Sequence, residues 1–484
     1  MLKLGRKIPL PVSTTGIALL LSVPAMVLAS MAFRGRVHSL ETNDSLYAVM
    51  TRMNLLQSFH GDPGRAPPAL WRERLGIQLS EDLWNLQGRG LWWQGWSDDG
   101  AAYLILPSRL WPSTTSPGVA SLHLGGIVVI GVDGLHRHQL LTILSGSSSE
   151  PLPKAQPLQR FCLRELTGKP AVMWTSEGLA SISGSLVSLL QGARVGCLSL
   201  QLNGNKMYWQ GVVGSRPFSS APSGLRAEPQ SKDSEELSFP RKDSPDELLL
   251  SLTSKRTDLL LGSLLSRRII RDPLETDYGL TDKDRLKLGL SPLELILMEQ
   301  NNGKFQASIQ MQLNLTGGTQ RWSPVIDAVS ARLQERGFDQ SAKSDSTLKS
   351  RDQVSSTATI WSRTENGKTD VVGGWIWHPS KSGQKIKNLK SKAIYNRLGL
   401  SLGASPLADA SLPTPQLLAD TAFRLWADPS RIGKLGMLSG SWPAVVQKAT
   451  ELQVELSELK GGNGGKAPWM WMKGQLTLAK PESP

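Results

Sequence analysis

Alternating apolar and polar residues recur along the chain in pairs of short runs joined by Asn-Gly or Asp-Gly turns. Such dipeptides tolerate positive φ angles, which tight hairpin turns require. The pattern predicts antiparallel hairpins at residues 91–106, 198–212, 293–315, 359–377 and 452–478. One hairpin cannot bury its apolar face alone, so we expect the hairpins to join in sheets that helices cover.

Two of these hairpins follow a run with helical periodicity, at 259–270 and 417–426. Each run precedes an Asp-Pro dipeptide, Asp272-Pro273 or Asp428-Pro429. We interpret the similarity as a degenerate internal repeat of a helix followed by a hairpin. The expected fold class is therefore α+β, with repeated helix-plus-hairpin units.

The segment Ser215–Pro245 is rich in serine and proline and poor in large apolar residues. This composition predicts a flexible linker at 214–246 between two domains, at 60–213 and 247–480. We expect one helix-covered sheet in each domain. The Ser-rich, aperiodic stretch 339–357 is predicted to be a loop inside the second domain.

The N-terminus carries three basic residues and then a charge-free stretch from Ile8 to Phe33, which Arg34 and Arg36 close. Its apolar part is just long enough to cross a bilayer, which takes roughly 20 residues. We expect residues 1–36 to form a signal anchor and transmembrane helix, followed by a helical stalk at 37–59. A cleaved signal peptide and a buried helix are the alternatives. The basic flank favours a single-pass membrane protein whose bulk is extracytoplasmic, in a periplasm or lumen.

Composition supports a globular body, since hydrophobic residues make up 39% of the chain and charged residues 20%. These values exclude wholesale disorder, collagen-like repeats and a polytopic membrane protein. With two cysteines, the chain is neither a disulfide-rich scaffold nor a Cys-rich zinc module. If the body is exported, Cys162 and Cys197 can form a disulfide, and two free thiols are the alternative.

No motif indicates catalysis. The chain has no Gly-x-Ser-x-Gly elbow, and its Ser346-x-x-Lys349 match lies in a polar, loop-like stretch. Gly461–Lys466 is followed by Ala467-Pro468 instead of Ser or Thr, which favours a turn over a phosphate loop. The local group Asp133, His136 and His138 is interpreted as the start of a helix at 135–144. We therefore expect no catalytic, cofactor-binding or metal-ligating residues.

Tryptophan is unusually frequent, at 16 residues against 8 phenylalanines and 5 tyrosines. Trp375 and Trp377 share one face of a predicted strand, as do Trp469 and Trp471. Exposed indoles would form a stacking platform for sugar rings, whereas buried indoles would be core. Alternation in a strand favours core, and Trp375 and Trp377 are the candidate platform.

The net charge of +13 makes an anionic partner plausible. The densest basic patch contains no acidic residue and comprises Lys381, Lys385, Lys387, Lys390, Lys392 and Arg397. It is either a solvated face or a contact for anionic lipid or an anionic glycan. Nucleic acid is disfavoured, because no recognisable nucleic-acid module accompanies the patch.

The run Leu259–Leu315, with Asp277-Tyr278-Gly279-Leu280 and Lys304–Ser308 inside it, resembles uncharacterised membrane-anchored proteins of photosynthetic bacteria. The resemblance covers about an eighth of the chain. It implies an envelope or thylakoid-facing location and carries no activity.

These observations predict a membrane-anchored extracytoplasmic scaffold or binding protein without catalytic activity. A glycan- or peptidoglycan-binding module that uses the tryptophans is the first alternative. A hydrolase whose site is assembled from distant residues is the second. The expected partners are the membrane, through the N-terminal helix, and other envelope proteins.

Overall fold

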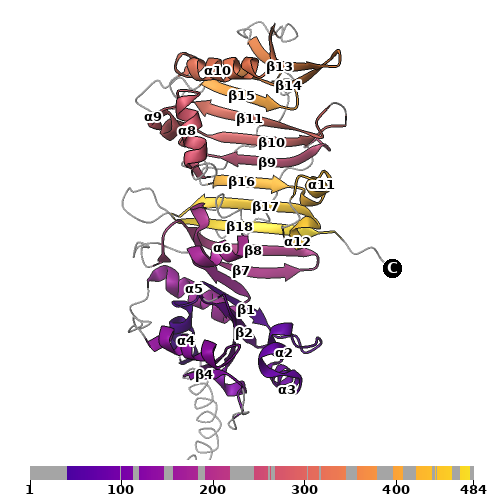
Figure 1. Cartoon of the computed structure of the whole chain (residues 1–484). Helices are drawn as coiled ribbons and strands as arrows, with labels where there is room; N and C mark the ends of the chain where they lie inside the picture. The colour runs from indigo at the N-terminus through magenta and orange to yellow at the C-terminus, as the bar shows by residue number, and fades with distance from the viewer. Residues whose placement is uncertain are drawn as a thin grey trace, which may run out of the picture. The chain divides into compact units, whose positions relative to one another are not determined.

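Figure 1 shows the computed structural model of the chain. It describes residues 41–98, 100–112, 119–145, 156–183, 191–218, 245–259, 262, 267–301, 304–315, 318–344, 357–378, 396–406, 421–438, 442, 444–459 and 469–479. Contacts divide the chain into two compact units, Met1–Ala155 and Gln156–Pro484. This division falls before the predicted linker, most of which (219–244) lies outside the described residues.

The first unit contains an antiparallel sheet in the order β1-β2-β3-β5-β4. A helix at 41–50 precedes it. The labelled elements are β1 (Leu55–His60), α2 (Ala69–Leu75), α3 (Ile77–Gln87), β2 (Leu91–Trp96), β3 (Ala102–Pro107), η1 (Ser108–Leu110), β4 (Ser121–Leu124), β5 (Ile127–Ile130) and α4 (Gly134–Ser145). The predicted stalk at 37–59 is thus corrected, because its last residues form β1 of the sheet and bury Leu56 completely.

Apolar residues of α2 and α3 bury one face of this first sheet. Trp71 and Trp84 meet Trp92 of β2 edge to face, with ring centroids 5.6 and 6.3 Å apart. Burial of three indoles supplies a large apolar area to a small core. The residues of this core are Trp71, Leu75, Leu83, Trp84, Trp92, Leu104, Leu106, Trp111, Val128 and Ile130.

The second unit is built on a much longer sheet. Its elements before the central strands are α5 (Pro157–Gly168), β6 (Ala171–Trp174), α6 (Ser176–Ser183), η4 (Gln191–Ala193), β7 (Val195–Asn203) and β8 (Lys206–Gly214). The next are β9 (Leu248–Ser254), α8 (Arg268–Thr276), α9 (Asp282–Gly289), β10 (Leu293–Glu299), β11 (Ala307–Leu315), α10 (Gly318–Glu335) and β12 (Asp339–Ser344). The last are β13 (Thr357–Glu365), β14 (Lys368–His378), β15 (Asn396–Leu402), β16 (Thr421–Ala427), α11 (Pro429–Lys434), α12 (Ala444–Gln447), β17 (Ala449–Glu458) and β18 (Trp469–Leu478).

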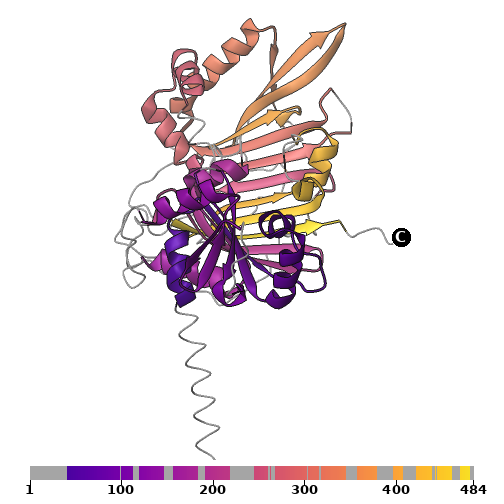
Figure 2. The same ribbon diagram turned by 60° about the horizontal axis from the view of Figure 1, so that its bottom comes forward.

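All described strands of this unit belong to one antiparallel sheet. Their order is β6-β7-β8-β18-β17-β16-β9-β10-β11-β15-β14-β13-β12, and Figure 2 shows the strands running side by side. The five predicted hairpins are confirmed as β2–β3, β7–β8, β10–β11, β13–β14 and β17–β18. Their predicted assembly into two helix-covered sheets, one on each side of the linker, is wrong. The strand β8 precedes the linker and pairs with β18, the last strand of the chain.

Two local predictions are also corrected. Residues 417–426, predicted to be helical, contribute most of β16, which pairs with β9 and β17. The predicted loop 339–357 begins as a strand, β12. The Asp-Pro dipeptides take different roles: Asp428 accepts a hydrogen bond from the Arg431 amide and caps α11, whereas Pro273 lies inside α8.

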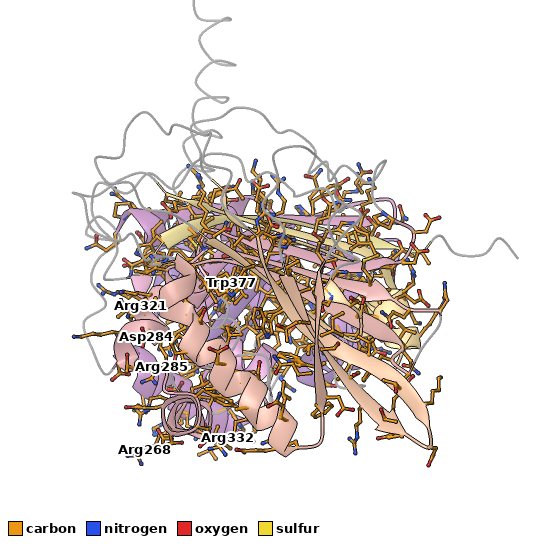
Figure 3. The ribbon with its side chains drawn as sticks, turned by 90° about the horizontal axis from the view of Figure 1, so that it is seen from above. Arg268, Asp284, Arg285, Arg321, Arg332 and Trp377 are labelled. Carbon is orange, nitrogen blue, oxygen red and sulfur yellow. A yellow bond between two sulfur atoms is a disulfide. The ribbon has the colours of Figure 1, made fainter. Side chains whose placement is uncertain are left out.

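Helices α8, α9 and α10 cover one face of β9, β10, β11, β15 and β14. Trp322 of α10 and Leu280, just before α9, pack there against Leu293, Leu313 and Leu398. An ion pair of 2.5 Å between Arg321 and Asp284 joins α10 to α9 (Figure 3). In a strand, side chains alternate between faces, so the even-numbered residues of β10 and β11 point away from these helices.

Three tryptophans of the second unit lie opposite glycines on neighbouring strands. The register pairs are Trp174 with Gly196, Trp469 with Gly214, and Trp209 with Gly474. In each pair a Cβ atom on the glycine would overlap the indole ring. The glycine, which has no side chain, therefore makes room for the ring. These tryptophans pack across neighbouring strands, which is a structural role within the sheet.

A disulfide joins α5 to β7 through Cys162 and Cys197, whose Cα atoms are 5.7 Å apart. Both residues are fully buried. Nearby, Phe161 of α5 meets Trp471 of β18 with ring centroids 6.0 Å apart. The bridge thus fixes α5 against the face of the sheet on which Cys197 lies.

No helix within the described residues is long and apolar enough to cross a membrane. The stretch predicted to form the transmembrane helix, 8–33, lies outside those residues. The described fold is therefore a sheet-dominated body, and a spanning helix is not part of it.

Candidate functional site

A row of polar side chains crosses the second unit on the sheet face opposite α8, α9 and α10. Directly paired residues of an antiparallel sheet point to the same face, so the strand register defines the row. We call it the polar strip, and it comprises Gln210, Lys473, Glu455, Arg424, Thr253, Glu294, Gln312, Arg397 and His378. The register partner of Gln312 is Gly399, and Arg397 lies two residues from it on the same face of β15. These residues come from nine neighbouring strands, β8 to β14 in sheet order. With strands about 4.8 Å apart, the strip is roughly 38 Å long.

An ion pair occupies the centre of the strip. Arg424 of β16 donates from Nε and Nη2 to Glu455 Oε2 of β17, at 3.2 and 2.8 Å. Both side chains are about one-seventh exposed. In this ion pair each charge compensates the other on a partly buried surface, and both side chains stay on the strip.

A second polar row lies beside the strip on the same face. Glu451 accepts hydrogen bonds from Trp426 Nε1 at 3.1 Å and from Gln453 Nε2 at 2.9 Å. Gln453 and its register partner Gln475 are 4% and 2% exposed, and their Oε1 atoms have no hydrogen-bond partner within the described residues. Buried polar atoms are rarely left unpaired, so an internal water would fit here.

The β14–β15 end of the strip gathers groups whose ionisation is perturbed. Arg397 Nη1 donates to Gln312 Oε1 at 2.9 Å. Burial raises the pKa of Glu294 above its ordinary value, and the charge of Arg397 opposes this shift. Burial lowers the pKa of His378, and the charge of Arg397 lowers it further. Clustered groups with shifted pKa values are candidates for a functional site.

We expect Glu294→Gln to stabilise the protein at neutral pH. Because the pKa of Glu294 is higher in the folded state than in the unfolded state, its contribution to stability is present below about pH 4.5. That contribution is lost as the pH rises through the folded-state pKa of Glu294, because the partly buried carboxylate is less well solvated than it is in the unfolded chain. The variant should therefore melt at a higher temperature than wild type at pH 7.5 and at the same temperature at pH 4. A melting temperature unchanged at both pH values would contradict the assigned burial effect.

The predicted basic patch is only partly within the described residues. Lys381, Lys385, Lys387, Lys390 and Lys392 lie outside them. Arg397 is half-buried on β15 and bonded to Gln312, so it belongs to the polar strip. The anionic-surface role of the five lysines stays a prediction.

The candidate aromatic platform is placed on the helix-covered face. Trp375 and Trp377 are half-buried and pack against the cluster that contains Leu313, Trp322 and Leu398. Figure 3 shows Trp377 beside α10. Trp469 and Trp471 are 0% and 6% exposed. These indoles are core residues, so the structure offers no sugar-stacking ladder at the positions predicted for one.

The remaining candidate residues have structural roles. Cys162 and Cys197 form the disulfide already described. Asp133 Oδ1 accepts from the His136 amide at 3.0 Å and meets His136 Nδ1 at 2.8 Å, at the start of α4. Within the described residues, no group of three His, Cys, Asp or Glu side chains could hold a metal ion. The Ser346–Lys349 and Gly461–Lys466 motifs lie outside those residues.

The polar strip was not predicted from the sequence. Each of the nine strands contributes one residue to it, and these residues are spread from Gln210 to Lys473, so no local motif exists. The signal that could have found it is the alternation of β10 and β11, where Glu294 and Gln312 stand between apolar residues.

The chain matches no known protein-family model, no curated protein and no solved structure. The function must therefore be argued from the strip itself.

Proposed function

We propose that the protein is an extracytoplasmic binding protein whose polar strip holds one extended glycan. The observation that carries this proposal is the row of polar side chains across nine strands, seven of which contribute an amide, carboxylate, guanidinium or imidazole group. Planar groups of this kind offer paired donors and acceptors, which suit neighbouring sugar hydroxyls. A binding role of this kind needs no catalytic residue.

The spacing of the strip supports an elongated ligand. The strip repeats once per strand, about every 4.8 Å, which is close to the length of one sugar ring. A ligand lying across the strands would meet a polar group at each step.

The strip favours binding over glycoside hydrolysis. Glu455, one of its two carboxylates, is held by Arg424 through two hydrogen bonds. The Cα atoms of Glu455 and Glu294 are three strand spacings, or about 14 Å, apart. A catalytic pair would have to bring its carboxyl groups to within roughly 5–10 Å across this gap.

The disulfide supports the expected location. Such bonds persist in oxidising compartments and are rare in the cytosol. Together with the basic flank and apolar stretch at the N-terminus, it favours a membrane-attached protein whose body is outside the cytoplasm. A tag after Pro484 should be digested by protease added from the extracytoplasmic side. A tag protected there and exposed to the cytoplasm would contradict this location.

The binding proposal is tested with glycans of known structure. Wild-type protein should co-sediment with peptidoglycan or chitin and bind their soluble oligomers in calorimetry. Gln312→Ala should weaken that affinity about five- to tenfold, because one or two hydrogen bonds are lost at the strip.

Gln340→Ala is the matched control. Gln340 is an exposed residue of the same sheet, and its register partner Trp361 pairs onward with Gly373, on the helix-covered face. This variant should bind as wild type does. Wild-type protein that binds no glycan, or equal losses in both variants, would refute the proposal.

A further inference from the structure

We propose that the β14–β15 end of the polar strip is a subsite for a carboxylate of the glycan, held by Arg397, Gln312 and His378 and favoured by protonation of Glu294. The inference rests on the proposed function, because it names the class of glycan that the strip selects: an acidic one.

The geometry of this end fits a planar anion. Arg397 has five N–H donors, and one of them is used by Gln312 within the described residues. The guanidinium fork can therefore give paired hydrogen bonds to a carboxylate. The His378 ring lies over Gly399, since a Cβ atom on that glycine would be 3.2 Å from His378 Nε2. Arg397 and His378 are register partners, so both groups face the same spot.

Glu294 opposes an anion at this spot when it is ionised. It lies opposite Gln312 in the register and makes no hydrogen bond or ion pair within the described residues. Its charge and that of Arg397 then sum to zero while His378 is neutral. Protonation of Glu294 and His378 would change this total to two positive charges.

Acidification acts on both titratable groups of this cluster in the same sense. Burial raises the pKa of Glu294 above its ordinary value, and burial and the charge of Arg397 lower the pKa of His378. Protonation of either group adds one positive charge beside Arg397. Lowering the pH therefore makes the cluster more favourable for an anion.

The other charged residues of the strip lie farther from this cluster. On β16 and β17, Arg424 and Glu455 are bonded to each other, two and three strands from Glu294. On β18, Lys473 is a further strand away. The neighbours on β9 and β11, Thr253 and Asn314, are uncharged. Within the described residues, the charge of Arg397 acts on both Glu294 and His378 and lowers the pKa of each.

The test compares one oligosaccharide in two forms, oligogalacturonic acid and its methyl ester. The acid should bind wild-type protein about tenfold more tightly at pH 5 than at pH 7.5, which corresponds to one added charge-assisted hydrogen bond. The ester should bind equally at both values. Glu294→Gln should raise the affinity for the acid at pH 7.5 and reduce the pH dependence.

Glu335→Gln is the control, because Glu335 lies on α10 and pairs with Arg332 away from the strip. It should leave affinity and pH dependence unchanged. If both ligands bind with no difference between pH 5 and pH 7.5, the carboxylate subsite is refuted while glycan binding stands. If neither ligand nor any other glycan binds, the proposed function fails together with the subsite.

Discussion

Removing the disulfide should lower the free energy of unfolding by about 4 kcal/mol. The disulfide joins residues 35 positions apart and so restricts the conformations of the unfolded chain. The chain-entropy relation gives a stabilisation of that size for a loop of this length. Cys162 and Cys197 are fully buried, so their replacement also removes packing between α5 and β7. We expect Cys162→Ala/Cys197→Ala to unfold at a clearly lower urea concentration than wild type.

Reductant provides the matched experiment. Dithiothreitol should shift the unfolding midpoint of wild type toward that of the double variant and should leave the double variant unchanged. Tryptophan fluorescence can follow the transition, because indoles lie in both units. A wild-type midpoint that reductant does not move would show that the bridge does not stabilise the protein.

Gly214→Ala should cost about 2–3 kcal/mol, although it adds a single methyl group. The new Cβ atom would overlap the ring of Trp469, which is completely buried and cannot move aside. Overfilling a packed interior typically costs 1–3 kcal/mol. The backbone of Gly214 has no positive φ, so the expected loss is purely steric.

Gly474→Ala is the internal comparison for this effect. It faces Trp209 in the same way, but Trp209 is only half-buried and can rotate toward solvent. The loss of stability measured by urea unfolding should therefore be smaller than for Gly214→Ala. Equal costs, or a larger cost at Gly474, would contradict the packing argument.

The hairpins could be predicted from sequence because their information is local. Alternation identifies the strands, and turns such as Asn203-Gly204 specify the reversal, with Gly204 at φ 60°. The order of hairpins in the sheet is not local. Nothing in the residues of β8 indicates that its second neighbour is β18 and not another strand of its own predicted domain.

The prediction of a helix where β16 lies was wrong for a different physical reason. The strand lies between β9 and β17, and it buries apolar residues at both parities, such as Phe423 and Trp426. Without alternation, a short apolar run cannot be distinguished from part of a buried helix. Pairing with β9 and β17 then determines that the segment is a strand and not a helix.

The candidate site could not be predicted from the sequence, because its residues come together only through the pairing of the strands. Arg397 was singled out for its charge, but its partner Gln312 and its neighbour Glu294 were not. The tryptophans were recognised as unusual, and burial was the favoured interpretation. That some of them lie opposite glycines, as Trp469 does opposite Gly214, could be recognised only from the pairing of β18 with β8.

The position of β18 sets the order in which the second unit can be completed. This strand lies between β8 and β17, and Asn205 Nδ2 donates to the Leu478 carbonyl across a sequence separation of 273 residues. Chains are made from the N-terminus, so β8 is synthesised long before its neighbour exists and exposes an open strand edge meanwhile. Folding of this part of the sheet must therefore wait until β18 has been synthesised. Slow synthesis or export of the residues between β8 and β18 would delay closure, and a holding chaperone for the β7–β8 hairpin would have time to act.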